Sequence, residues 1–89
     1  MAVSPDWPAL RDWLQKLPTN LSGTAIVANT PLLESGLLDS LGILDLVSFL
    51  EERFALALPL KEFVPENFRT PAAILAMTER LRAAPGSGD

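Results

Sequence analysis

The chain has 89 residues, of which 48% are apolar and 20% are charged, and its net charge is −4. This length and composition are typical of one small globular domain, and the excess of acids disfavours nucleic-acid binding because phosphates repel them. Cys, His and Tyr are absent, which excludes disulfides and thiolate metal sites and removes most catalytic nucleophiles and general bases. We therefore expect no enzymatic activity and no metal centre.

No apolar run approaches the roughly 20 residues that a membrane-spanning helix needs. The N-terminal stretch MAVSPDWPAL has neither the positive region nor the apolar segment of a signal peptide. We therefore expect a cytoplasmic protein that does not bind membranes.

A first helix is predicted to begin near Ser4 or Asp6, either of which could serve as its N-cap. Four apolar residues then share one face at the spacing i, i+3, i+4 and i+7: Leu10, Trp13, Leu14 and Leu17. Pro18 is expected to end this helix near Leu17. We expect Trp13 in the core and Trp7 holding the N-terminus against it.

Residues 18–39 are predicted to form a long loop, because Gly, Pro, Asn, Ser and Thr recur along them. The loop also holds many apolar side chains: Leu21, Ile26, Val27, Leu32, Leu33, Leu37 and Leu38. Such a segment is expected to pack over a helical core, with one short turn at Thr24–Ala28.

The second helix is predicted from about Ser40 to Phe54, with Asp39 as its N-cap. At 100° per residue its core face consists of Ile43, Leu46, Val47, Leu50 and Phe54, and its opposite face of Leu41, Asp45, Ser48 and Glu52. Phe49 falls between the two faces, and we expect it to pack against a short third helix.

After a connector at Ala55–Leu60, Pro65–Phe68 is predicted to form a single helical turn, and Thr70-Pro71 to begin the last helix. The core stripe of that helix consists of Ile74, Met77 and Leu81. The predicted fold is all-α: a small four-helix bundle with three main helices, a short third helix and a long packed loop between the first two. We expect a single domain over 1–89, with its core at about 5–82 and a flexible tail at 83–89.

Two interpretations of Asp39-Ser40 are open. In the first, Asp39 alone caps the helix, so the Ser40 hydroxyl is free where an attached phosphate would meet unpaired backbone N–H groups. Leu41 beside it, with Asp39, Asp45 and Glu52 nearby, then resembles a partner-docking surface. In the second, Ser40 is an ordinary cap or a phosphorylation site, and the acids form an ordinary solvated helix face.

The stretch GLLDSLGILDLVSFLEERF, residues 36–54, resembles the carrier-protein superfamily, which includes acyl, peptidyl and aminoacyl carrier proteins. Its signature is Asp-Ser-Leu at the start of the second helix. FVPENFRTPAAI, residues 63–74, is similar to the family's short third helix leading into the fourth, and the resemblance extends over roughly 10–81. It implies that Ser40 carries a 4′-phosphopantetheine arm taken from coenzyme A, whose thiol holds acyl or aminoacyl thioesters. It further implies that Asp39, Leu41, Asp45 and Glu52 are recognition contacts.

The resemblance also implies a set of partners: a phosphopantetheinyl transferase, a loading ligase or acyltransferase, and downstream biosynthetic enzymes that act on a monomeric carrier. Residues 39–54 have a net charge of −3, which would steer basic surfaces of these enzymes towards the second helix. Any sequestered cargo is expected between the second and third helices, against Val47, Leu50 and Phe63.

The sequence departs from the carriers of fatty-acid synthesis. Gly42 and Ile43 occupy positions where those carriers usually have an acid and a polar residue, and Arg53 interrupts the acids at the helix end. The chain is more similar to stand-alone carriers of polyketide or nonribosomal-type natural product biosynthesis. The alternative hypothesis is a non-enzymatic helical interaction module that has no prosthetic group.

Overall fold

Capping groups and prolines determine where the helices begin in the computed structural model, which describes residues 6–21 and 23–83. Over these residues the chain forms four α-helices and one short 3-10 helix, in the order α1 (Trp7–Gln15), α2 (Ser40–Phe54), η1 (Leu60–Glu62), α3 (Pro65–Phe68) and α4 (Pro71–Ala83). No strand is present in this part of the chain. The all-α prediction, with a short third helix, is confirmed. Ser4 and residues 84–89 of the predicted tail lie outside the described residues.

Helix α1 is shorter than predicted. Its N-cap is Asp6, and a proline occupies its first turn. It ends at Gln15 because Lys16 and Leu17 donate to carbonyls only three residues back, at 3.3 and 3.2 Å, in a tightened last turn.

Helix α2 has the predicted boundaries. It ends where Ala55 adopts a left-handed conformation, with φ 52° and ψ 50°. This conformation closes many helices, but it usually occurs at glycine, because a Cβ atom makes it unfavourable.

The Ala55→Gly variant is therefore expected to be more stable than the wild type by about 0.5–1 kcal/mol. Urea denaturation at constant m-value measures the change. Ala57→Gly is the matched control, because Ala57 is also exposed and lacks a positive φ. That control should lose up to about 1 kcal/mol through the added freedom of the unfolded chain. Equal changes in the free energy of unfolding of the two variants would contradict the inference that the left-handed conformation of Ala55 is strained.

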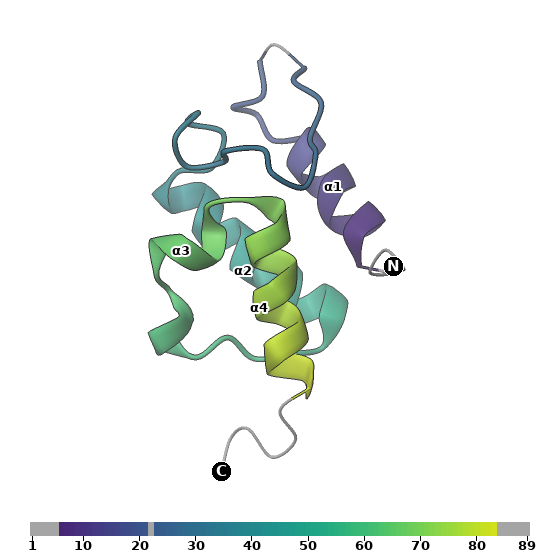
Figure 1. Cartoon of the computed structure of the whole chain (residues 1–89), viewed down its shortest axis with the longest axis vertical. Helices are drawn as coiled ribbons and strands as arrows, with labels where there is room; N and C mark the ends of the chain where they lie inside the picture. Colours follow the sequence, from purple (N-terminus) through teal and green to yellow (C-terminus); the bar gives the residue numbers. More distant parts are fainter. Residues whose placement is uncertain (1–5, 22, 84–89) are drawn as a thin grey trace.

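The long loop between α1 and α2 arches over one end of the helices (Figure 1) and is fastened at several points. The Gln15 side chain accepts from the Ile26 backbone N–H at 3.1 Å and donates to the Thr24 carbonyl at 2.6 Å. Two backbone hydrogen bonds also join the loop to the region of α4. The Leu32 amide donates to the Arg69 carbonyl at 2.8 Å, and the Ala72 amide donates to the Ala28 carbonyl at 2.9 Å. The described residues of the loop are therefore an ordered part of the fold.

Two details of the predicted loop were wrong. The loop leaves Leu21 and Val27 in solvent, 92% and 52% exposed, although Ile26, Leu32, Leu37 and Leu38 are buried as expected. The short turn spans 27–30 in place of the predicted 24–28, because the Thr30 amide donates to the Val27 carbonyl. The Thr30 hydroxyl also accepts from the Val27 amide at 2.8 Å, which explains why this threonine is buried.

The core lies among the four α-helices and the loop. Its fully buried side chains come from every one of these elements: Leu10, Leu14, Leu32, Leu46, Leu50, Phe68, Ile74 and Met77. Of the predicted core face of α2, Ile43 and Phe54 are only half-buried.

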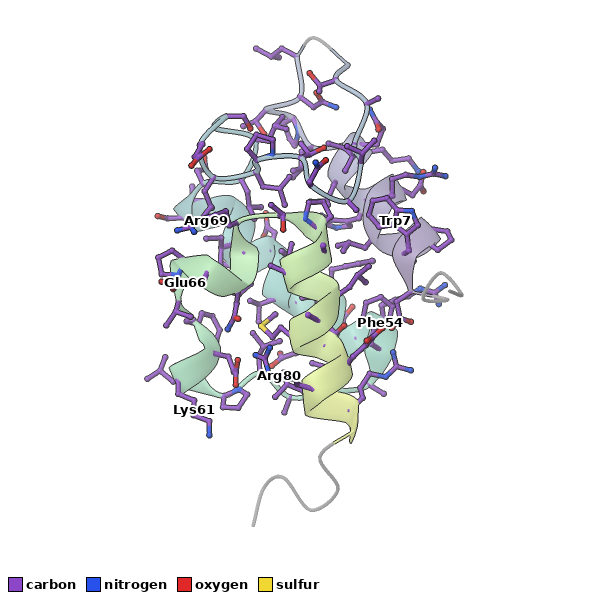
Figure 2. The ribbon with its side chains drawn as sticks, in the orientation of Figure 1. Trp7, Phe54, Lys61, Glu66, Arg69 and Arg80 are labelled. Atoms are coloured by element: carbon purple, nitrogen blue, oxygen red, sulfur yellow. The ribbon has the colours of Figure 1, made fainter. Side chains whose placement is uncertain are left out.

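The aromatic side chains of α2 turn towards α1. Phe49 stacks on Trp13, with ring centroids 5.5 Å apart and an interplanar angle of 22°, and its edge meets Phe54 at 5.9 Å. The prediction that Phe49 packs against the short third helix was therefore wrong. Trp7 and Trp13 are half-buried against the core, and Figure 2 shows Trp7 and Phe54 on the side of the molecule away from Lys61 and Glu66.

Two polar clusters tie distant parts of the chain together. Glu62 of η1 accepts from Arg80 of α4 at 2.8 Å and from the Asn67 side chain of α3 at 2.9 Å. Arg82 of α4 pairs with the buried carboxylate of Asp6 before α1, and its guanidinium lies 5.8 Å from the centre of the Phe54 ring. These contacts hold η1, α3 and the start of α1 against α4.

Among the described helices, each is too short or too polar to cross a lipid bilayer.

Candidate functional site

Ser40 is the first residue of α2, and its side chain is exposed. Asp39 is the N-cap, because its carboxylate oxygen Oδ1 accepts the Gly42 backbone N–H at 2.8 Å. Within the described part of the chain, the Ser40 hydroxyl has no hydrogen-bond partner. The cap is thus provided by Asp39 alone, and the Ser40 hydroxyl is open to reaction from solvent.

Stability measurements can separate the two residues. Asp39→Ala is expected to cost about 1 kcal/mol of unfolding free energy through loss of the N-cap, whereas Ser40→Ala should change it by less than about 0.5 kcal/mol. The two urea midpoints, compared with that of the wild type, test this. An equal loss in both variants would show that Ser40 shares the capping role.

An apolar cleft of about 350 Å³ opens beside Ser40, between α2 and α3. It is lined by Leu33, Ser40, Ile43, Leu44, Phe63, Val64, Pro65 and Phe68. The sequence predicted its position and the contribution of Phe63. The expectation that Val47 and Leu50 line it was wrong, because both are buried in the core.

Leu44 was missed by the sequence analysis. It lies one helical turn after Ser40, is 59% exposed and borders the cleft, as does the partly exposed Val64. The spacing i, i+4 from Ser40 would have revealed it, because residues four apart share one face of a helix.

The predicted recognition residues are all exposed around the start and outer face of α2. Leu41 is 74% exposed, and Asp39, Asp45 and Glu52 lie open to solvent. Glu51 differs from them, because its carboxylate accepts the Leu58 backbone N–H at 3.0 Å and so fixes the connector after α2. An acidic surface therefore borders Ser40, and the recognition roles of its members are predictions.

This arrangement fits a phosphodiester at the start of α2. The side chain there is a free hydroxyl, and the first backbone N–H groups of a fifteen-residue helix have no partner within the helix. A negatively charged group is favoured at this positive helix end. The neighbouring apolar cleft offers a lining for a flexible arm or its cargo.

Comparison with known proteins identifies the family. The model of the phosphopantetheine attachment site matches residues 12–78, so the chain belongs to the phosphopantetheine-binding carrier proteins. Carriers of this family hold the prosthetic group covalently and present substrates to enzymes. The chain is accordingly a carrier protein with covalently attached phosphopantetheine, and it is not an enzyme.

Three curated relatives agree with this membership. The chain is 38% identical to the probable acyl carrier protein PigG of Serratia sp. (strain ATCC 39006), over 68% of this chain and 70% of the relative. It is 40% identical to the D-alanyl carrier protein of Leuconostoc citreum (strain KM20), over 54% of this chain and 62% of the relative. It is 47% identical to the lincomycin biosynthesis protein LmbN of Streptomyces lincolnensis, over 65% of this chain but only 21% of that longer protein.

Proposed function

We propose that the Ser40 hydroxyl is the attachment point of 4′-phosphopantetheine. The observation that supports this most strongly is that Asp39 satisfies the N-cap, which leaves Ser40 as a free, exposed hydroxyl at the start of α2. A phosphopantetheinyl transferase would transfer the group from coenzyme A to the Ser40 oxygen, with loss of the hydroxyl proton and release of adenosine 3′,5′-bisphosphate. The bound group supplies the thiol that this Cys-free chain lacks.

The cargo we propose is a short acyl or aminoacyl unit of natural product biosynthesis of the polyketide or nonribosomal type. One relative is named for lincomycin biosynthesis and another for carrying D-alanine, and both names favour small cargo of this kind. The cleft of about 350 Å³ beside Ser40 is also modest in size and open.

The enzymes that act on the proposed carrier are a loading ligase or acyltransferase, followed by biosynthetic enzymes that use the thioester. We place these reactions in the cytoplasm and treat residues 1–89 as one monomeric carrier domain with its core at about 5–82. The exposed acids near Ser40, namely Asp39, Asp45 and Glu52, favour enzymes with basic docking surfaces.

Intact mass spectrometry tests the attachment. The wild-type chain, incubated with coenzyme A, Mg²⁺ and a promiscuous phosphopantetheinyl transferase, is expected to gain one phosphopantetheine. Proteolysis and fragmentation should locate the added mass on Ser40. A folded chain that gains no mass, or that gains it on another residue, would contradict the proposal that Ser40 is the attachment point.

A further inference from the structure

The segment that leads into α2, residues 32–39, is held in place at several points. The Leu38 amide donates to the Leu32 carbonyl at 3.0 Å, which closes the segment into a compact turn, and the Leu32 amide donates to the Arg69 carbonyl at 2.8 Å. Three of its side chains are buried in the core: Leu32, Leu37 and Leu38. These backbone bonds fasten the segment to the region before α4, and neither of them reaches α1.

The side chain of Thr19 connects this segment to the end of α1. Its hydroxyl donates to the Leu37 carbonyl at 2.5 Å, across eighteen positions of the chain. Among the described residues, this is the one hydrogen bond that joins residues 32–39 to α1 or to the turn that follows α1. Because Leu37 comes only three residues before Ser40, the bond acts close to the proposed attachment residue.

The turn that carries Thr19 is itself fastened to α1. The Asn20 amide donates to the Leu17 carbonyl at 2.9 Å, and the Asn20 side chain donates to the carbonyl of Gln15, the last residue of α1, at 3.1 Å. The donor hydroxyl of Thr19 is therefore held relative to α1, and its bond relates the position of α1 to the segment that precedes Ser40.

The first turn of α2 depends on where this segment places Asp39. Two hydrogen bonds close that turn, and Asp39 accepts both: its carboxylate accepts the Gly42 amide and its carbonyl accepts the Ile43 amide, each at 2.8 Å. Helix ends that lose such partners fray. Since Asp39 lies two residues after Leu37, a shift of Leu37 would move the groups that hold Ser40 at the helix start.

We propose that Thr19 is a positioning residue for phosphopantetheine transfer, because its bond to Leu37 holds the first turn of α2 and so orients the Ser40 hydroxyl. The inference rests on the proposed attachment at Ser40. In the transfer, the Ser40 oxygen bonds to the phosphorus that carries pantetheine, and the bond from that phosphorus to adenosine 3′,5′-bisphosphate breaks. The hydroxyl proton passes to a base of the transferase. Such a displacement is sensitive to the alignment of the attacking oxygen.

Single-turnover kinetics with a promiscuous transferase in excess separate docking from transfer. Thr19→Val leaves the Leu37 carbonyl without this donor, so the saturating rate should fall about three- to tenfold, while the half-saturating transferase concentration stays within about twofold of the wild type. Thr19→Ser keeps the hydroxyl and should restore most of the rate. Thr24→Val is the matched control, because Thr24 is an exposed threonine of the same loop whose hydroxyl bonds to no described residue. Its rate should equal that of the wild type.

Amide hydrogen exchange of the unmodified chain tests the positioning without the transferase. In Thr19→Val, the Gly42 and Ile43 amides should exchange faster than in the wild type, whereas the α4 amides and the whole of Thr24→Val should not change. Circular dichroism verifies the fold of each variant.

Three results would overturn the positioning role of Thr19 alone, on a wild-type chain that is modified normally. The first is a wild-type saturating rate in folded Thr19→Val. The second is an unchanged rate with a raised half-saturating concentration, which would mean that Thr19 contacts the transferase directly. The third is an equal loss of rate in Thr19→Val and Thr19→Ser. A wild-type chain that is not modified at all would overturn the attachment at Ser40 and the positioning role together.

Discussion

The Ser40→Ala variant is expected to gain no mass from coenzyme A under conditions that convert the wild type completely. The variant lacks the oxygen that would form the phosphodiester, and without the arm the Cys-free chain has no thiol to carry a thioester. Every later loading step should therefore be lost as well. Intact mass after incubation with the transferase measures the first loss, and radiolabelled acyl or aminoacyl transfer measures the second.

Ser48→Ala is the matched control. Ser48 is an exposed serine on the same helix, two turns beyond Ser40, and its loss should leave modification at the wild-type level. Both variants should keep the wild-type circular dichroism, since neither serine caps a helix. Modification of Ser40→Ala at any measurable level would mean that another residue carries the group.

The boundaries of α2 could be predicted because local signals determine both ends. Asp39 is a strong N-cap, and the apolar pattern of the helix ends at Phe54. The same holds for α3, where Pro65 is well suited to a first helical turn. The exposure of Ser40 followed from the same reasoning, because one capping side chain is sufficient at a helix start.

Features that depend on distant residues could not be predicted in this way. A helical wheel places Phe49 between two faces, but only the path of the long loop determines that Trp13 is the ring it meets. Helix η1 was not predicted, and its Glu62 is held by Arg80, eighteen residues away. The hollow of about 450 Å³ lined by Trp13, Asp45 and Phe49 likewise combines residues from two helices separated by that loop, so spacing within either helix does not reveal it.

Phe68→Ala is expected to cause the largest loss of stability among the changes considered. Phe68 is 1% exposed, and it is the one residue of α3 that is buried. A four-residue helix is not stable alone, so the burial of this ring holds α3 against the core. Replacing a buried Phe by Ala costs about 3–5 kcal/mol. The total stability of a domain of this size is about 5–13 kcal/mol, so the variant should lose a large share of it.

Urea denaturation and amide hydrogen exchange together test the role of Phe68. Phe68→Leu is the matched control, because it keeps an apolar side chain at the site and should cost much less. If Phe68 holds α3 in place, exchange of the α3 amides in Phe68→Ala should accelerate more than exchange of the α2 amides, and the cleft beside Ser40 would lose one wall. A loss below about 1 kcal/mol in Phe68→Ala would contradict this role, because it would fall far short of the cost of an unfilled cavity. Retention of modification in a folded Phe68→Leu chain would show that the transferase does not require the full apolar lining of the cleft.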